Sequence, residues 1–122
     1  MRVFKYKRFS QWAKKEGILD LALKLAVDEL SQGLFEANLG GGLYKKRIAR
    51  QGEGKRAGVR TLLAFKQHHR AIFVFGFAKN ERSNIGDGEK EVFKRLAKTY
   101  LMITGKNLER LLQLGEIIEV IS

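Results

Sequence analysis

Two stretches of the chain repeat their apolar residues at the spacing of an amphipathic helix. The first runs from Ile18 to Leu30, with charged residues on its opposite face, and Gly33 follows it as a stop signal. The second begins at Asp87, and its apolar side is formed by Val92, Phe93, Leu96, Ala97, Tyr100 and Leu101. The pattern therefore predicts two long helices that each pack one face against a core.

Capping and turn residues predict the shorter elements. Ser10 can N-cap a short helix near the N-terminus, and Asn107 can cap a last short helix before the C-terminus. The polar, glycine-rich residues 51–58 are predicted to form a flexible loop. The adjacent His68 and His69 fall between two strand-like runs, at a distance that suits a hairpin turn.

Five stretches are predicted to be strands because they alternate in polarity or are rich in apolar residues: 2–6, 43–49, 59–66, 71–78 and 116–122. The fourth is apolar on both faces, which is typical of a central strand covered by helices. The order of elements predicts one α+β domain over residues 1–122, with a small antiparallel sheet packed against N-terminal helices and a C-terminal helix.

Composition restricts the possible classes of protein. With 122 residues, 44% hydrophobic and 30% charged, the chain has the composition of a globular domain. It contains no cysteine, so disulfide and thiolate metal sites are excluded. Nothing approaches the roughly 18 consecutive apolar residues of a membrane helix, and the basic N-terminus lacks the apolar run of a signal peptide. We expect a cytoplasmic protein without a membrane partner.

The positive charge is large and unevenly distributed. The formal net charge is +11 and the pI is about 10.1, which suggests an anionic partner such as nucleic acid, an acidic protein or a membrane surface. Six Lys or Arg residues fall within the first fifteen positions and seven more between positions 45 and 60. Scattered charge would suit simple solubility, whereas this clustering favours binding of a polyanion.

The strand at 43–49 carries the basic residues most suited to hold a phosphate. Alternation places Lys45 and Arg47 on one face, about 7 Å apart, and Lys46 on the other face. Arg60, at the start of the next strand, lies beside the pair if the hairpin register is suitable. Arginine binds phosphate through two parallel hydrogen bonds. The alternative is a solvated sheet face, which we consider weaker because no acidic residue is expected nearby.

The usual signatures of metal-dependent or nucleotide-dependent catalysis are missing from the sequence. There is no phosphate-binding loop motif, and no pair of carboxylates has a spacing that suggests two-metal chemistry. The adjacent His68 and His69 point apart in a turn. Metal-free RNA cleavage remains feasible with Lys and Arg, which can move protons and neutralise the phosphorane. We expect no metal and no cofactor.

Two blocks of the sequence resemble a known family. GGLYKKRIARQGEGKRAGVRTLLAF, followed by FVFGFAKNERSNI, resembles the RelE/ParE superfamily of type II toxin–antitoxin toxins, most closely its HigB-like branch, over about residues 12–103. The resemblance implies a small α+β fold with an antiparallel sheet. It also implies ribosome-dependent cleavage of mRNA, with contacts to rRNA, and inhibition by a cognate acidic antitoxin.

The resemblance also implies which residues carry the activity. Those implied to be catalytic are Lys45, Arg47, Arg60 and Lys79. Those expected to contact RNA are Lys46, Arg50, Lys55, Arg56 and Arg82. The sequence departs from RelE at two places. Asn80 stands where RelE has an arginine, for which Lys79 or Arg82 is a possible substitute. Gly86 stands near the position of RelE's catalytic tyrosine. HigB-like toxins are similar in lacking that tyrosine.

Two other functions stay open at this stage. A ParE-like toxin would act on DNA gyrase by protein binding, without nuclease chemistry, and a plain nucleic-acid-binding domain would have no catalytic activity. The strand at 116–122 is a candidate for pairing with an antitoxin, although pairing within its own sheet is the stronger expectation.

Overall fold

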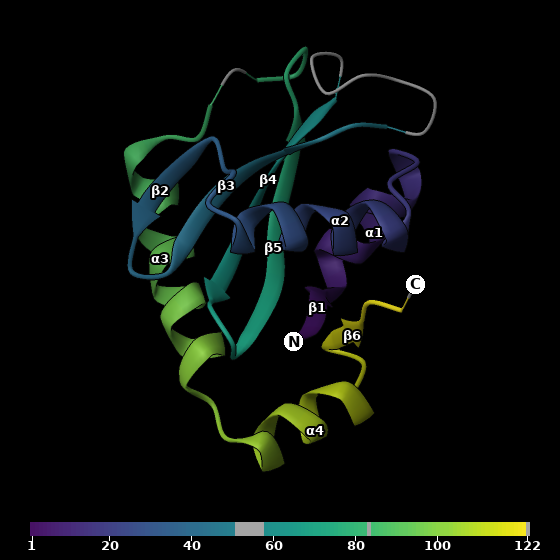
Figure 1. Cartoon of the computed structure of the whole chain (residues 1–122), viewed down its shortest axis with the longest axis vertical. Coiled ribbons are helices and arrows are strands. Elements are labelled where there is room, and N and C mark those ends of the chain that lie inside the picture. Colours follow the sequence, from purple (N-terminus) through teal and green to yellow (C-terminus); the bar gives the residue numbers. More distant parts are fainter. Residues whose placement is uncertain (51–57, 83, 122) are drawn as a thin grey trace.

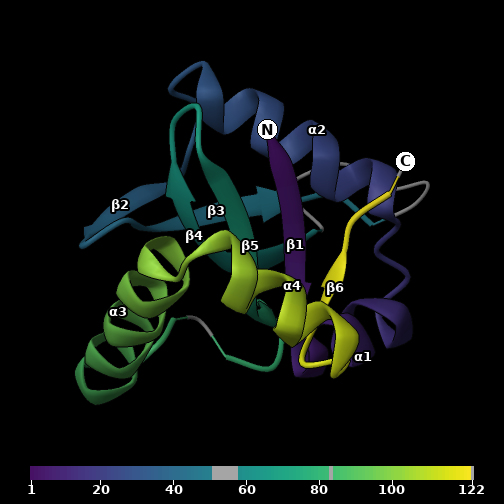
Figure 2. The ribbon, with the colours of Figure 1, turned by 90° about the horizontal axis from the view of Figure 1, so that it is seen from below.

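A single mixed sheet forms the centre of the molecule, and helices cover both of its faces (Figures 1 and 2). The computed structural model describes residues 1–50, 58–82 and 84–121, and within them the chain forms six strands and four helices. In chain order the elements are β1 (Arg2–Tyr6), α1 (Lys7–Lys15), α2 (Asp20–Ser31), β2 (Ala37–Gly40), β3 (Leu43–Ile48), β4 (Val59–Lys66), β5 (Arg70–Ala78), α3 (Asp87–Met102), α4 (Gly105–Gln113) and β6 (Ile117–Glu119).

The sheet has the strand order β2-β3-β4-β5-β1-β6, which runs from left to right in Figure 1. Its neighbours are antiparallel except β1 and β5, which are parallel. The prediction of an α+β domain with a largely antiparallel sheet is confirmed. The C-terminal strand β6 pairs with β1, so the expectation that it pairs within its own sheet is also confirmed.

The core is divided into two apolar clusters, one on each face of the sheet. On one face α1 and α2 pack on residues such as Phe73, with Leu23 of α2 completely buried. On the other face α3 and α4 pack on residues such as Leu62, with Ala97 of α3 completely buried. Figure 2 shows the sheet between α2 on one side and α3 and α4 on the other. None of the described helices is long and apolar enough to cross a membrane.

Two helix starts differ from the prediction. Helix α1 begins at Lys7 and not after Ser10, because the chain turns directly out of β1 and the first N–H of the helix donates to the carbonyl of Glu116 at 3.0 Å. Helix α4 is capped by the Thr104 hydroxyl, which accepts a hydrogen bond from the Asn107 N–H at 3.2 Å. Asn107 therefore lies inside the helix that it was expected to cap.

The segment that follows α2 is fastened at both ends. Gly33 has a φ of +86°, and the Leu34 N–H returns to the carbonyl of Glu29 at 3.0 Å, which closes the helix in a Schellman motif. The Glu36 N–H then donates to the carbonyl of Lys45 at 2.9 Å, beside the short strand β2. Strand β2 was not predicted, because its four residues ANLG contain no β-branched or aromatic side chain.

A β-bulge in β5 decides which side chains face α3. The register between β4 and β5 shifts between Leu62 and Leu63, so β5 carries one extra residue there. An extra residue moves all following side chains to the opposite face. Phe75 consequently faces α3, where its ring stacks on that of Phe93 at 4.8 Å, and Phe77, two residues further along β5, lies on the same face opposite Arg60. The sequence of β5 is apolar at nearly every position and contains no signal for this change.

Candidate nucleic-acid interface

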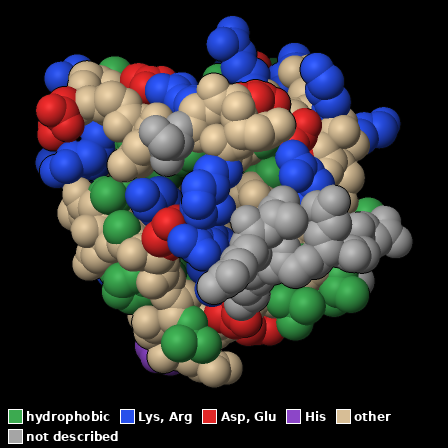
Figure 3. All heavy atoms as spheres, turned by 90° about the horizontal axis from the view of Figure 1, so that it is seen from above, with side chains coloured by type: hydrophobic (Ala, Val, Ile, Leu, Met, Phe, Trp, Pro, Cys, Tyr) green, Lys and Arg blue, Asp and Glu red, His purple; other side chains and the backbone are tan. Residues whose placement is uncertain are grey.

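Basic side chains gather at the end of the sheet where β3 stops and β4 begins. Arg47 and Arg60 are direct partners in the β3–β4 register, and Lys45 lies two residues earlier on β3. The hairpin register is therefore the one that brings Arg60 beside Lys45 and Arg47. Figure 3, which looks onto this end of the molecule, shows Lys and Arg side chains gathered with an acidic side chain among them. Lys55 and Arg56, expected to contact RNA, lie outside the described residues.

Glu36 lies between the two arginines. Its carboxylate is 3.0 Å from Nε of Arg60 and 3.4 Å from Nη2 of Arg47. Two like charges directly opposite on neighbouring strands destabilise a sheet, and the carboxylate offsets that repulsion. The expectation that no acidic residue lies near the basic strand was wrong. Glu36 is separated from its two partners by 11 and 24 residues and precedes a strand that was not predicted, so no local pattern indicated the contact.

The two arginines keep buried donors that have no partner in the described part of the chain. The Arg60 side chain is only 6% exposed, and its Nη1 is buried without a hydrogen bond, as is Nε of Arg47. Buried donors are almost always paired, and leaving one unpaired costs about 1–3 kcal/mol. Phe77, 2% exposed, lies opposite Arg60 and closes the apolar side of this position. These donors lack acceptors, and the oxygens of an anion are acceptors of the kind that they lack.

Arg82 forms the second part of the basic group. Its Nε donates to the carbonyl of Asn84 at 3.2 Å, and the Asn84 side-chain oxygen lies 3.4 Å from Nζ of Lys45. The guanidinium binds both carboxylate oxygens of Glu89 and lies 5.9 Å above two phenylalanine rings of β5, one of which is Phe77. The bulge that turns these rings toward α3 thus also supports Arg82.

The pair formed by Arg82 and Glu89 is ionised and anchors the start of α3. Hydrogen bonds from Arg82, followed by one from the Gly86 backbone, hold the pKa of Glu89 below its usual value. The same hydrogen bonds to Glu89 raise the pKa of Arg82. Because Gly86 N–H donates to Glu89 at 3.0 Å, the carboxylate also caps the helix. Arg82 is therefore held in one position by Glu89 and by Asn84, the residue that also contacts Lys45.

Comparison with known families assigns the chain. A family model described as the RelE toxin of the RelE/RelB toxin–antitoxin system matches residues 1–120. The chain belongs to the RelE toxin family. The resemblance found in the sequence to the RelE superfamily is thereby confirmed and extends over almost the entire chain. Comparison with curated proteins gave no match. Membership of this family implies an antitoxin partner, whereas the placement in the HigB-like branch stays a prediction.

In this RelE-family chain, Lys46 and Arg50 pair with acidic residues other than Glu36, whereas Lys79 follows Ala78, the strand partner of Val59. Lys46 is 5% exposed and its ammonium is 2.9 Å from Glu29 of α2, on the opposite face of β3. Arg50 forms an ion pair with Glu16 at 2.6 Å. Lys79 is exposed at the end of β5. The structure thus groups Lys45, Arg47 and Arg60 on one face of the β3–β4 pair, links Arg82 to Lys45 through Asn84, and places the Lys46 side chain on the opposite face.

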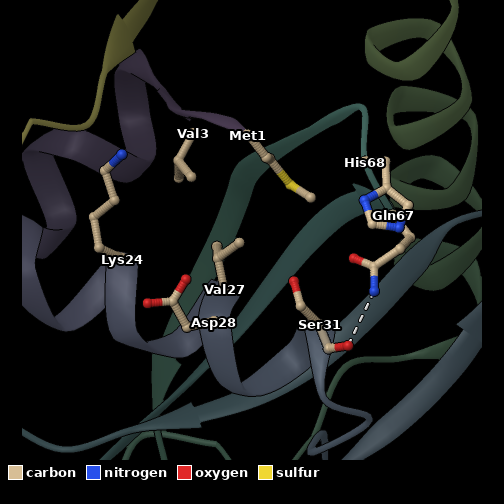
Figure 4. A pocket seen from close by; sticks show the side chains of 8 residues that line it. All are labelled: Met1, Val3, Lys24, Val27, Asp28, Ser31, Gln67 and His68. Atoms are coloured by element: carbon tan, nitrogen blue, oxygen red, sulfur yellow. Dashed lines mark hydrogen bonds between the residues drawn. The ribbon is translucent and has the colours of Figure 1, made fainter.

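The RelE-family chain also has a hollow of about 570 Å³ at the other end of the sheet. Figure 4 shows its lining residues, among them Met1, Lys24 and Asp28, and the hydrogen bond from the Gln67 amide to the carbonyl of Ser31 at 3.0 Å. Because it adjoins the β4–β5 turn, it is remote from the arginine pair at the start of β4. Among the described residues no group of three or more His, Asp or Glu side chains could hold a metal ion.

Proposed function

We propose that this RelE-family chain is a toxin that blocks translation by cleaving mRNA on the ribosome. The observation that carries the proposal is the pair of directly opposed arginines, Arg47 and Arg60, which share one carboxylate and retain buried N–H donors without a partner. A phosphate diester offers the oxygens that these donors lack. RNA is the anion that the family membership favours.

The residues of the site divide the chemistry of cleavage between them. The RNA 2′-hydroxyl loses its proton and attacks the adjacent phosphorus, the bond to the 5′-oxygen breaks, and that oxygen takes up a proton, so a 2′,3′-cyclic phosphate and a 5′-hydroxyl result. Arg47 and Arg60 stabilise the charge on the phosphorane. In this proposal Lys45 transfers a proton, Arg82 holds a neighbouring phosphate, and Lys79 contributes a further positive charge.

Brief induction in growing bacteria tests the proposal. Incorporation of labelled methionine should collapse before that of labelled thymidine, and mapped mRNA ends should fall at one position within codons. Arg60→Met should abolish both effects, whereas Lys98→Met, at an exposed position of α3, should leave them intact. Earlier loss of thymidine incorporation would favour a gyrase inhibitor and contradict the proposal.

A further inference from the structure

Two large apolar side chains are exposed directly before Glu36. Leu34 is 54% exposed and Phe35 is 41% exposed. In a Schellman motif the residue at the Leu34 position usually packs on the side chain three residues before the end of the helix. Here that residue is Glu29, whose carboxylate pairs with Lys46, so Leu34 lacks the usual apolar partner. The fold does not use this apolar surface for its own core.

Phe35 is nevertheless held firmly. Its ring lies 5.1 Å from the ring of Tyr44 in an edge-on arrangement, and Tyr44 lies 5.7 Å from Phe65 at an interplanar angle of 90°. Phe65 is 8% exposed and belongs to the core. The three rings form a continuous support from the interior to the surface. An aromatic side chain that is already fixed loses little conformational entropy when a ligand stacks on it.

The exposed ring and Arg47, one member of the arginine pair, line one concave surface. A hollow of about 310 Å³ is lined by Leu34, Phe35, Glu36, Lys46 and Arg47. Arg47 therefore contributes both to this hollow and to the phosphate site, where its buried Nε has no partner. A ligand suited to this hollow presents an anionic group to Arg47 and an apolar, flat group to Phe35. A nucleotide of single-stranded RNA has both.

We propose that Phe35 is a stacking platform for one unpaired RNA base next to the phosphate that Arg47 and Arg60 hold. The proposal rests on the proposed function, and it adds a residue that positions the substrate. Because every base has an aromatic face, such a platform accepts any base and fixes where the strand lies, and with it which phosphate reaches Arg60. Leu34 borders the same hollow and supplies further apolar contact.

Single-turnover cleavage of mRNA on programmed ribosomes tests the platform with the full chain. Phe35→Ala should raise the toxin concentration needed for half-maximal rate by about 5- to 150-fold, the cost of losing one base–aromatic stack. Phe35→Trp should retain the wild-type value. Leu21→Ala is a matched control, because Leu21 is 57% exposed on α2 and contributes to neither the hollow nor the arginine pair.

An mRNA series with one abasic nucleotide at each position around the cut identifies the stacked base. At one position, loss of the base should raise the wild type's half-maximal toxin concentration as much as Phe35→Ala does on intact mRNA. On that same abasic mRNA, Phe35→Ala should cause no further increase. Absence of cleavage by the wild type would overturn the proposed function and the platform together. Equal cleavage by the wild type and Phe35→Ala would overturn the platform alone. The platform would also be overturned if Phe35→Ala cut mRNA normally but was no longer inhibited by its antitoxin. If Phe35→Ala does not fold, the abasic series on the wild type decides.

Discussion

Arg60 is the residue at which we expect stability and activity to separate most sharply. Arg60→Met keeps an apolar side chain over Phe77 and removes the guanidinium. Breaking a fully buried ion pair costs about 3–5 kcal/mol, but the Glu36 side chain is 25% exposed and still contacts Arg47, so the loss is nearer 1–3 kcal/mol. Removing the unpaired Nη1 returns about 1–3 kcal/mol. The free energy of unfolding should therefore change by no more than about 2 kcal/mol in either direction.

Arg60→Ala should behave differently because it also removes the stem that covers Phe77. Three missing heavy atoms make it less stable than Arg60→Met by about 2 kcal/mol. Both variants should lose cleavage by about 10²- to 10³-fold, the cost of removing a donor that stabilises a transition-state anion. The contrast between the two substitutions separates packing from chemistry at one position.

Urea unfolding and single-turnover cleavage of the same preparations measure the two effects. Arg95→Met is the control, since Arg95 is exposed on α3 and should change neither quantity. A loss of more than about 3 kcal/mol in Arg60→Met would show that the ion pair with Glu36 holds the fold together, and the argument from the unpaired donor would be wrong. Retention of cleavage by Arg60→Met would refute the assignment of Arg60 to the reaction.

Three further predictions follow from the contacts described. Glu36→Gln should lower the free energy of unfolding by about 1–2 kcal/mol, because Arg47 and Arg60 then face each other without a carboxylate; urea unfolding measures this. The same variant should steepen the salt dependence of RNA binding, which titrations between about 50 and 200 mM salt measure. Burial raises the pKa of Tyr100 to about 12. The free energy of unfolding should therefore be unaffected by this group below about pH 10 and should fall, by on the order of 2 kcal/mol, as the pH rises through 12. Tyr100→Phe should abolish this loss in unfolding experiments at about pH 9 and 11. Association with an acidic antitoxin should slow as salt rises, and a rate that is flat with salt would mean that the antitoxin recognises an apolar surface.

Local patterns in the sequence were sufficient to predict much of the fold. Helical spacing and Gly33 located α2 and its end, and alternation placed Lys45 and Arg47 on one face and Lys46 on the other. The proximity of Arg60 followed from the geometry of a hairpin between two predicted strands. These features depend on residues that are close in sequence or on adjacent strands, where sequence periodicity is informative.

The parts that were missed depend on contacts between distant residues. Glu36 reaches the arginines only because Gly33 reverses the chain and β2 fastens the segment to β3. The bulge that brings Phe77 beneath Arg60 is a local change of register, and a strand that is apolar on both faces conceals it. Lys46, expected to contact RNA, has its charge occupied by Glu29 of α2, which alternation alone could not reveal.

The free protein carries an electrostatic imbalance at the arginine pair that a ligand can correct. Two guanidinium groups share the single carboxylate of Glu36, which leaves an excess of one positive charge and two buried donors without acceptors. One phosphate diester supplies one negative charge and the missing oxygens. If the proposed function holds, the energy that the fold loses at this position in the free state is recovered on binding of RNA, as expected where a site is preorganised for its ligand. Since a ligand that binds only the folded state stabilises it, short RNA should raise the melting temperature of the wild type and should do so less in Arg60→Met.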